Sequence, residues 1–336
     1  MIAGLGPDQT QNLQKWVRRG AIVGGATVAA GVGLRLISRA QTRGLESRPD
    51  PTTDYPDAVE RLDQLRALDD DTVNPVCRSR GLLHGRKTEQ AVILIHGLTN
   101  CPQQFAPLGT TLFEREVNVL LPRMPRHGLA DRLTTELGKL RAEELRAFGD
   151  QVVDIGAGLG DRVTVVGLSA GGLVAAWAAQ YRSELDKAVL IAPSTGFGSA
   201  GGYLQLFFMN VARALPDIAT QRFIKTDTAM PYAYVGWSSR SLGEVLRFGL
   251  ATFRAAVGTK PATQHLVMVT NANDTAVNNQ LARHLVALWQ TRGLRRIESY
   301  EFDRELGLEH DLIDPNNPRQ QIDLVYPLLL DLILGR

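Results

Sequence analysis

The stretch VTVVGLSAGG, residues 163–172, begins as a β-branched run typical of a buried strand and ends in Gly-x-Ser-x-Gly. Small residues with helical spacing follow directly, at 170–182. A serine at such a junction is either the cap of a surface helix or a nucleophile that a tight turn presents at the end of a sheet. Since the chain of 336 residues contains 32 glycines, the pentapeptide alone does not distinguish the two.

Strand-like and helix-like segments alternate on both sides of this stretch. Runs typical of buried strands occupy 91–97, 117–122, 162–169, 187–194, 265–274 and 296–302. Helical spacing occupies 102–116, 135–156, 170–182, 278–291 and the chain from about 318. The alternation predicts an α/β fold in which helices cover both faces of a mostly parallel central sheet. Between about 195 and 260 two helix-like stretches follow one another without a strand, which predicts a helical lid inserted over the sheet.

Composition excludes several classes of function. The net charge is +2, from 37 basic and 35 acidic residues, and no long run of one sign stands out. We therefore expect no nucleic-acid partner. Two cysteines are too few for a metal cluster or a disulfide scaffold. We expect neither a metal nor a cofactor, because the serine chemistry predicted below needs none.

The first 40 residues predict a targeting segment. A basic stretch with the pair Arg18 and Arg19 precedes about fifteen mostly apolar residues that end at Arg35. As a helix this run spans roughly 22 Å, short of the ~30 Å hydrocarbon core of a bilayer. It suits a signal peptide cleaved after Ala40, and the arginine pair resembles a twin-arginine export signal. The alternatives are a membrane anchor through residues 16–38 and a cytosolic helix, and we expect a protein exported to, or anchored in, a bacterial periplasm or cell envelope.

Residues 41–75 are polar, charged and proline-containing, which predicts a linker with one short amphipathic helix near 57–68. The folded domain is then expected over 76–336. Cys77 and Cys101 both fall in it. Export would place them in an oxidising compartment, so we hypothesise that they form a disulfide, with two free thiols as the alternative.

A serine hydroxyl needs a neighbouring base to become a nucleophile. Of the six histidines, His127 and His310 follow strands, and so fall at the edge of a parallel sheet where ligands bind. Asp274 ends another strand, with Asp303 as a spare acid. The order Ser169, Asp274, His310 is the nucleophile–acid–base order of hydrolases built on such a sheet. It predicts Ser169 as nucleophile, His310 as base and Asp274 as the residue that orients the base, with His127 structural.

An acyl transfer also needs two N–H groups to bind the oxyanion. One is expected from Ala170, directly after the serine. The other is expected from Leu98, after the strand 91–97, where Gly97 allows a close approach of the backbone. His96 is expected to be structural, and Cys101, which has no base at a neighbouring strand end, is rejected as a nucleophile.

The segments ILIHGLTNCPQQF, MPRHGL, VVGLSAGG, NANDTAVN and LEHDLID together resemble the α/β-hydrolase superfamily, and bacterial carboxylesterases and monoacylglycerol lipases in particular. The resemblance covers about 76–336. It implies an α/β-hydrolase fold with the same nucleophile, acid, base and oxyanion donors. Two positions depart from the family pattern, Arg126 for a common glycine and Ala170 for a common methionine, and both weaken any inference about the substrate.

We therefore expect a serine ester hydrolase that cleaves uncharged esters with short to medium acyl chains through an acyl-enzyme. The substrate would be a small-molecule ester or a lipid-like molecule, with the lid supplying an apolar binding face. The alternatives are a monoacylglycerol lipase, amide, lactone or C–C hydrolysis, acyl transfer, and a non-catalytic binding protein of the cell envelope. The oligomeric state is left open.

Overall fold

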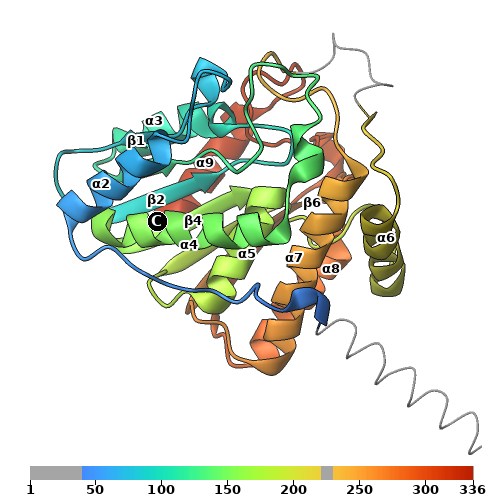
Figure 1. The fold of residues 1–336 in the computed structure, drawn as a ribbon. Helices are drawn as coiled ribbons and strands as arrows, with labels where there is room; N and C mark the ends of the chain where they lie inside the picture. The colour runs from blue at the N-terminus through green and yellow to red at the C-terminus, as the bar shows by residue number, and fades with distance from the viewer. Residues whose placement is uncertain (1–39, 221–229, 336) are drawn as a thin grey trace, which may run out of the picture. The chain divides into compact units, whose positions relative to one another are not determined.

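The computed structural model describes residues 40–220 and 230–335. Within them seven strands form one sheet in the order β1-β3-β2-β4-β5-β6-β7, in which β1 and β3 are antiparallel and all other neighbours parallel (Figure 1). The strands are β1 (Arg80–Leu82), β2 (Thr88–Ile95), β3 (Asn118–Leu121), β4 (Gly160–Leu168), β5 (Lys187–Ile191), β6 (His265–Asn271) and β7 (Arg296–Phe302). The predicted α/β fold with a mostly parallel sheet is confirmed. The edge strand β1 was not predicted, because three residues are too few to show a period.

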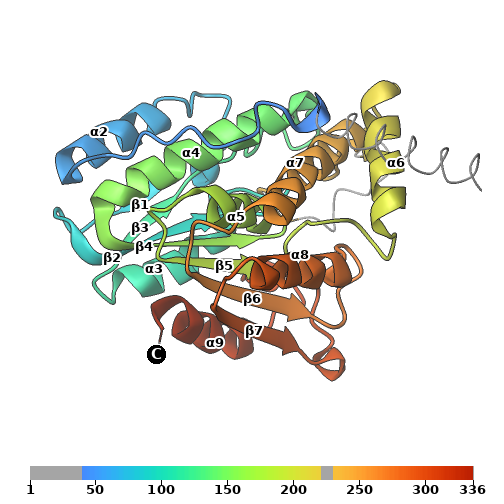
Figure 2. The ribbon, with the colours of Figure 1, turned by 90° about the horizontal axis from the view of Figure 1, so that it is seen from below.

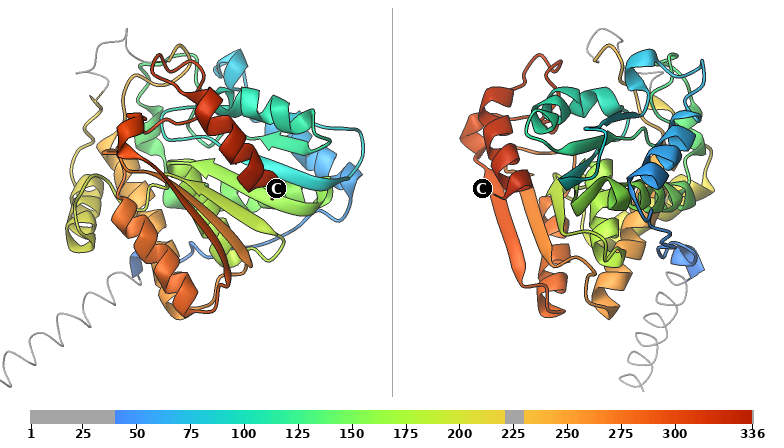
Figure 3. Two further views of the ribbon diagram at one scale, coloured as in Figure 1. Left: turned by 180° about the vertical axis from the view of Figure 1, so that it is seen from behind. Right: turned by 90° about the vertical axis from the view of Figure 1, so that its left-hand side faces the viewer.

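Helices cover both faces of the sheet (Figure 2). One face is covered by α4 (Ala142–Leu159), α5 (Ala170–Tyr181), α7 (Ser239–Gly258) and α8 (Asn279–Thr291). The other face is covered by α3 (Ala106–Phe113) and α9 (Ile322–Leu334), which lie together in the view from behind (Figure 3). The predicted helix over 135–156 begins only at Ala142, and a separate 3-10 turn, Glu136–Lys139, precedes it.

The central strand β2 shows why the strands read as continuous apolar runs. Ala91, Ile93 and Ile95 point into the core beneath α4 and α5, and Val92 and Leu94 point into the core beneath α3 and α9. All five side chains are essentially buried. Because both faces are covered, each side of the strand must be apolar.

The segment predicted as a linker, residues 41–75, instead packs on the domain from residue 44 onward. Its helix α2 (Tyr55–Arg66) lies against α4, and Leu45 and Leu62 are fully buried. Gly158 in α4 makes this contact close, since a Cβ there would lie 2.3 Å from the carbonyl oxygen of Asp54. The helix predicted near 57–68 is present as α2, but the prediction that this segment is a linker was wrong, because its abundant charges conceal a few buried apolar side chains.

The predicted insertion at about 195–260 divides into two parts. Val245 and Phe248 of α7 are fully buried in the same core as α4 and α5, so α7 belongs to the helical layer of the domain. The other helix, α6 (Gly202–Ala214), is held by the buried Gln205, whose amide bonds both backbone groups of Phe197. A lid function of α6 and the loop after it stays a prediction.

Cys77 and Cys101 form a disulfide, as hypothesised, with 5.2 Å between their Cα atoms. It joins the segment before β1 to the loop after β2. The predicted signal peptide or anchor lies, up to residue 39, outside the described residues. In the part of the chain that the structure describes, we find no helix that is long and apolar enough to cross a membrane.

Candidate active site

Ser169 occupies the sharp turn between β4 and α5. Its backbone has φ 58° and ψ −114°, a region that residues with a side chain rarely enter. Gly167 and Gly171 permit the turn, because a Cβ on Gly167 would lie 2.1 Å from the carbonyl oxygen of Gly171, and one on Gly171 would lie 2.1 Å from that of Ile95. The strain is therefore held in place by close backbone packing on both sides of the serine.

Ser169 is fixed to β5 and to the segment just after it by three contacts. Its N–H donates to the carbonyl oxygen of Ile191 at 2.9 Å, and its own carbonyl oxygen accepts from the N–H of Ser194 at 2.9 Å. The two hydroxyl oxygens, Ser169 Oγ and Ser194 Oγ, also lie 2.9 Å apart. The hydroxyl of Ser169 thus has a partner at rest that sequence reasoning missed. Ser194 could have been found, since it ends the predicted strand 187–194 beside the strand that carries Ser169.

Asp274 and His310 are brought together from the loops after β6 and β7. His310 Nδ1 lies 2.7 Å from Asp274 Oδ2, and the side chain of Asp274 is fully buried. Asp274 Oδ1 also accepts hydrogen bonds from the backbone N–H groups of Ala276 and Val277. Because the carboxylate accepts from Nδ1, the neutral imidazole carries its proton there and leaves Nε2 free to accept one.

The surroundings of Asp274 keep it ionised. Burial alone would raise the pKa of its carboxyl group. The hydrogen bond and charge of His310 and the two backbone N–H groups outweigh burial and hold this pKa below its ordinary value. Asp274 can therefore orient His310 and stabilise its protonated form.

The two predicted oxyanion donors, Leu98 and Ala170, both lie close to Ser169: Leu98 lines the same cavity, and Ala170 is the next residue in the chain. Ala170 is the first residue of α5, whose first N–H groups have no partner within the helix. Leu98 follows Gly97, and a Cβ on Gly97 would lie 3.6 Å from the Cβ of Ser169. The next residue, Thr99, has φ 70°, which is rare for a β-branched side chain. The loop after β2 thus approaches the serine closely and is itself strained.

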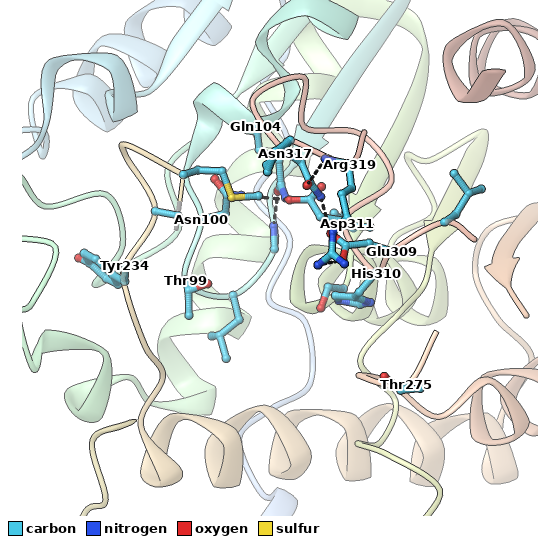
Figure 4. Close-up of a pocket in the computed structure, with 18 of the residues that line it drawn as sticks. Thr99, Asn100, Gln104, Tyr234, Thr275, Glu309, His310, Asp311, Asn317 and Arg319 are labelled. Atoms are coloured by element: carbon cyan, nitrogen blue, oxygen red, sulfur yellow. Dashed lines mark hydrogen bonds and ion pairs between the residues drawn. The ribbon is translucent and has the colours of Figure 1, made fainter. Parts of the chain in front are cut away.

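A cavity of about 550 Å³ contains both Ser169 and His310. Leu98 lines it from one loop, and Thr275 and Tyr234 lie on opposite sides of the view in Figure 4. Much of its wall is polar: Thr99, Asn100, Gln104, Asn273, Thr275, Glu309, Asp311, Asn317 and Arg319. Arg319 pairs with Glu309, so its charge is already compensated.

Three other predicted roles can be compared with the structure. His96 and His127 are fully buried and bonded to backbone, Nδ1 of His96 to Gly97 O at 2.9 Å and Nδ1 of His127 to Pro125 O at 2.7 Å. Burial lowers the pKa of His127 to about 4, so it stays neutral. Asp303 caps a 3-10 turn through a bond to the N–H of Glu305. Both histidines are therefore structural, and Asp303 is occupied as a cap.

A polar cluster behind the loop after β2 was not predicted. Asp311 and Asp314, just after His310, accept hydrogen bonds from Asn100 Nδ2 at 3.4 Å each, and Gln104 Nε2 donates to Asp311 Oδ2 at 2.7 Å. Tyr232 donates its hydroxyl to Asp314 Oδ1 at 2.5 Å. Figure 4 shows Asn100, Gln104 and Asp311 gathered on one side of His310. Only the run of polar residues in LEHDLID hinted at this cluster.

Among the described residues, no group of three or more His, Cys, Asp or Glu side chains is arranged to hold a metal ion.

The chain matches a known protein family. The model of the alpha/beta hydrolase family matches residues 92–320. The chain is similar in structure to the monoacylglycerol lipase of Paleococcus ferrophilus (TM-score 0.58, 15% identity, 76% of this chain and 98% of that chain). It is also similar to a structure reported for the metagenome-derived lipolytic enzymes LipS and LipT (0.56, 16%, 79% and 100%) and to the enol-lactonase of Burkholderia xenovorans (0.50, 16%, 77% and 96%). At these identities the likeness concerns the fold alone, and a comparison with curated protein sequences gives no match.

Proposed function

Because the chain belongs to the alpha/beta hydrolase family, we propose that it is a serine hydrolase that cleaves carboxylic esters through an acyl-enzyme. The observation that carries the proposal is one cavity that holds both a serine in a strained strand-to-helix turn and a histidine bonded to a buried carboxylate. The backbone of Ser169 supports the proposal, because φ 58° with ψ −114° is a strained combination of the kind that clusters at active sites.

The first half of the proposed reaction forms the acyl-enzyme. Ser169 Oγ leaves its partner Ser194 and gives its proton to Nε2 of His310 as it attacks the carbonyl carbon of the ester. The imidazolium is stabilised by Asp274, whose carboxylate already bonds Nδ1. The oxyanion would be bound by the N–H groups of Leu98 and Ala170. His310 then gives its proton to the leaving alcohol.

The second half releases the acid. Water replaces the alcohol, His310 takes a proton from it, and the hydroxide equivalent attacks the acyl carbon. Collapse of the second tetrahedral intermediate returns the proton to Ser169 Oγ. The step balances without a cofactor, since water supplies both the hydroxyl of the acid and the proton of the serine.

We propose small, uncharged esters with short to medium acyl chains as substrates. Glu309 and Asp311 line the cavity, and the cation there, Arg319, is already paired with Glu309. Their combined charge disfavours a substrate that is an anion. An anionic ester such as a hemisuccinate should show a KM several times higher than its neutral methyl ester at pH 8.

The Cys77–Cys101 disulfide supports the proposal that the chain works outside the cytoplasm, in a periplasm or cell envelope. Fractionation of cells that express the full chain would test this, with an N-terminally truncated chain as the cytoplasmic reference.

The test of the main proposal is hydrolysis of p-nitrophenyl butyrate by the wild type and by Ser169→Ala and Ser194→Ala. We expect Ser169→Ala to lose turnover by on the order of 10⁴-fold or more and to escape labelling by a fluorophosphonate probe. Ser194→Ala should keep labelling at Ser169. Undiminished turnover by Ser169→Ala would exclude the proposed nucleophile, and a wild type that neither turns over nor labels would favour a binding protein.

Lactone hydrolysis is the second candidate, because the same attack and the same oxyanion groups serve a cyclic ester, and the enol-lactonase of Burkholderia xenovorans has this fold. A panel of acyl esters and lactones of equal carbon number separates the two.

A further inference from the structure

Gln104 lies at a position that links the two loops of the candidate site. It belongs to the element after the loop 97–100, a 3-10 turn over Pro102–Phe105, and its side chain is buried at the cavity wall. Its Oε1 accepts the N–H of Gly97 at 2.8 Å, and its Nε2 donates to Asp311 Oδ2 at 2.7 Å. One amide side chain thus bonds the loop of the proposed oxyanion donor and the loop of the proposed base.

The bonds around Gly97 fix both peptide groups that flank it. The carbonyl oxygen of Gly97 lies 2.9 Å from Nδ1 of His96 and accepts the N–H of Asn100 at 3.2 Å. In a planar trans peptide the N–H points opposite to the C=O, so these bonds set the direction of the N–H of Leu98. The N–H of Gly97 itself, in the preceding peptide, is held by Gln104. Without Gln104 that preceding peptide could rotate and carry the following one with it.

Asp311 determines which way the amide of Gln104 faces. An ionised carboxylate only accepts hydrogen bonds, so the Nε2 end must face Asp311 and the Oε1 end must face Gly97. Asn100 supplies a second donor to Asp311, and the N–H groups of Ile313 and Asp314 bond its other oxygen. The carboxylate is thus itself held in place.

From this arrangement, and resting on the proposed function, we propose that Gln104 is a positioning residue: oriented by Asp311, it holds the loop 97–100 so that the N–H of Leu98 faces the oxyanion formed at Ser169. Gln104 acts on the backbone of Gly97 and not on the substrate. Its loss should therefore affect the transition state more than the binding of the ester.

The chain offers a matched control in the neighbouring Gln103. It belongs to the same 3-10 turn, but its Oε1 accepts from Arg80 Nη2 at 3.1 Å, away from the cavity. Gln104→Met and Gln103→Met remove the same polar group from adjacent positions. We expect Gln104→Met to lower kcat for p-nitrophenyl butyrate by on the order of tenfold or more, with KM within twofold of wild type. Gln103→Met should leave both constants within twofold.

Gln104→Glu provides a rescue that depends on pH. Beside Asp311, a glutamic acid that keeps its proton can donate to the carboxylate and accept from Gly97, as the amide does. The other titratable groups nearby are Asp314, His310, Tyr232 and Tyr326. Burial raises the pKa of both tyrosines, so they stay neutral below pH 9. His310 is present in both enzymes, so its contribution largely cancels in the ratio of the two kcat values. That ratio, Gln104→Glu to wild type, should approach one near pH 6 and fall as the pH rises to 9.

Two further measurements separate this inference from the proposed function. Affinity for a trifluoromethyl ketone, which forms an oxyanion on the serine, should fall in Gln104→Met in parallel with kcat/KM. Hydrogen exchange at the N–H groups of Gly97 and Leu98 should be faster in Gln104→Met than in Gln103→Met, whether or not the wild type hydrolyses an ester. Any of three results would overturn the positioning role. The first is equal kcat values for Gln104→Met and Gln103→Met in an active enzyme. The others are a kcat ratio for Gln104→Glu that does not depend on pH, and equal exchange rates in the two methionine variants. An inactive wild type with unequal exchange rates would reject the proposed hydrolysis and keep the loop-holding role.

Discussion

At residue 171 the structure leaves no space for a side chain. A Cβ there would lie 2.1 Å from the carbonyl oxygen of Ile95, and this oxygen belongs to the central strand β2. We expect Gly171→Ala to lower the free energy of unfolding by about 2 to 4 kcal/mol, because the strand or the turn must shift. Urea denaturation measures it. Gly249→Ala is the control, with the opposite sign expected. Gly249 lies in the middle of α7, and a Cβ on it would lie 3.6 Å from the side chain of Leu173, an ordinary van der Waals contact. Alanine there should raise the free energy of unfolding by roughly 0.5 kcal/mol.

Replacing Asp274 separates the proposed orientation of His310 from the nucleophilic role proposed for Ser169. Asp274→Asn keeps the shape of the side chain but offers a donor to His310, which favours the wrong tautomer. We expect kcat to fall on the order of 10³- to 10⁴-fold, with the fold intact by circular dichroism. Asp303→Asn, at the alternative acid of the sequence, should retain kcat. A loss of activity confined to Asp303→Asn would reverse the assignment of the acid.

Asp311 should make stability depend on pH. Burial, and then the charge of Asp314, raise the pKa of Asp311 to about 6 from its ordinary value near 3.8. Because the folded protein holds this proton more tightly than the unfolded chain does, protonation of Asp311 stabilises the fold. That stabilisation is fully present below pH 3.8 and is lost as the pH rises through 6. Asp311→Asn removes it. The stability of the variant relative to wild type should therefore rise between pH 4 and pH 7, as measured by urea denaturation at both values, and a difference that does not change with pH would contradict the prediction.

At the scale of elements, substitutions in α2 show whether the folded domain begins before residue 76. Leu62 in α2 is fully buried in the core that it shares with α4. We expect Leu62→Ala to cost about 2 to 5 kcal/mol and Leu68→Ala, at a side chain 63% exposed, to change the free energy of unfolding by less than about 0.5 kcal/mol. Equal effects would mean that α2 is a linker helix after all.

The inner strands were predictable because each is apolar on both faces, and a short continuous apolar run followed by turn residues, such as 163–168, is typical of a buried strand. The helix α2 was predicted, but its packing on the domain was not, because a few buried leucines among many charges do not distinguish a packed helix from a helix in a linker. The sequence also did not show that α7 packs in the main helical layer while α6 does not. The reason is that nothing in the local sequence distinguishes a helix of that layer from a helix of an insertion. Tertiary packing decided both cases.

At the scale of the molecule, the disulfide closes a loop from Cys77 to Cys101, a separation of 24 residues. Restricting the unfolded chain in this way should stabilise the fold by about 3 kcal/mol. Replacing both cysteines by serine should lower the free energy of unfolding by about that amount, measured with urea under non-reducing conditions. The wild type and the double variant should become nearly equal once a reductant has opened the bond. A difference that persists unchanged after reduction would assign the effect to the thiol packing and not to the cross-link.

The predicted site residues could be named from the sequence because they fall at strand ends, and topology brings strand ends together. Ser169, Asp274 and His310 needed only the order of the strands. Gln104 and Asp311 could not be found in this way. Their contact depends on how far a loop and a 3-10 turn reach across the edge of the sheet, which no periodicity records.

The groups around the cavity come from parts of the chain that are far apart, from Leu98 after β2 to His310 after β7. Contacts of such long sequence separation form slowly, since most of the chain must be ordered, at a cost in entropy, before these contacts can stabilise the fold. During synthesis, Ser169 leaves the ribosome well before Asp274 and His310 do. A nascent chain therefore has its serine before it has a base opposite it, and the site becomes complete only when the segment after β7 has emerged.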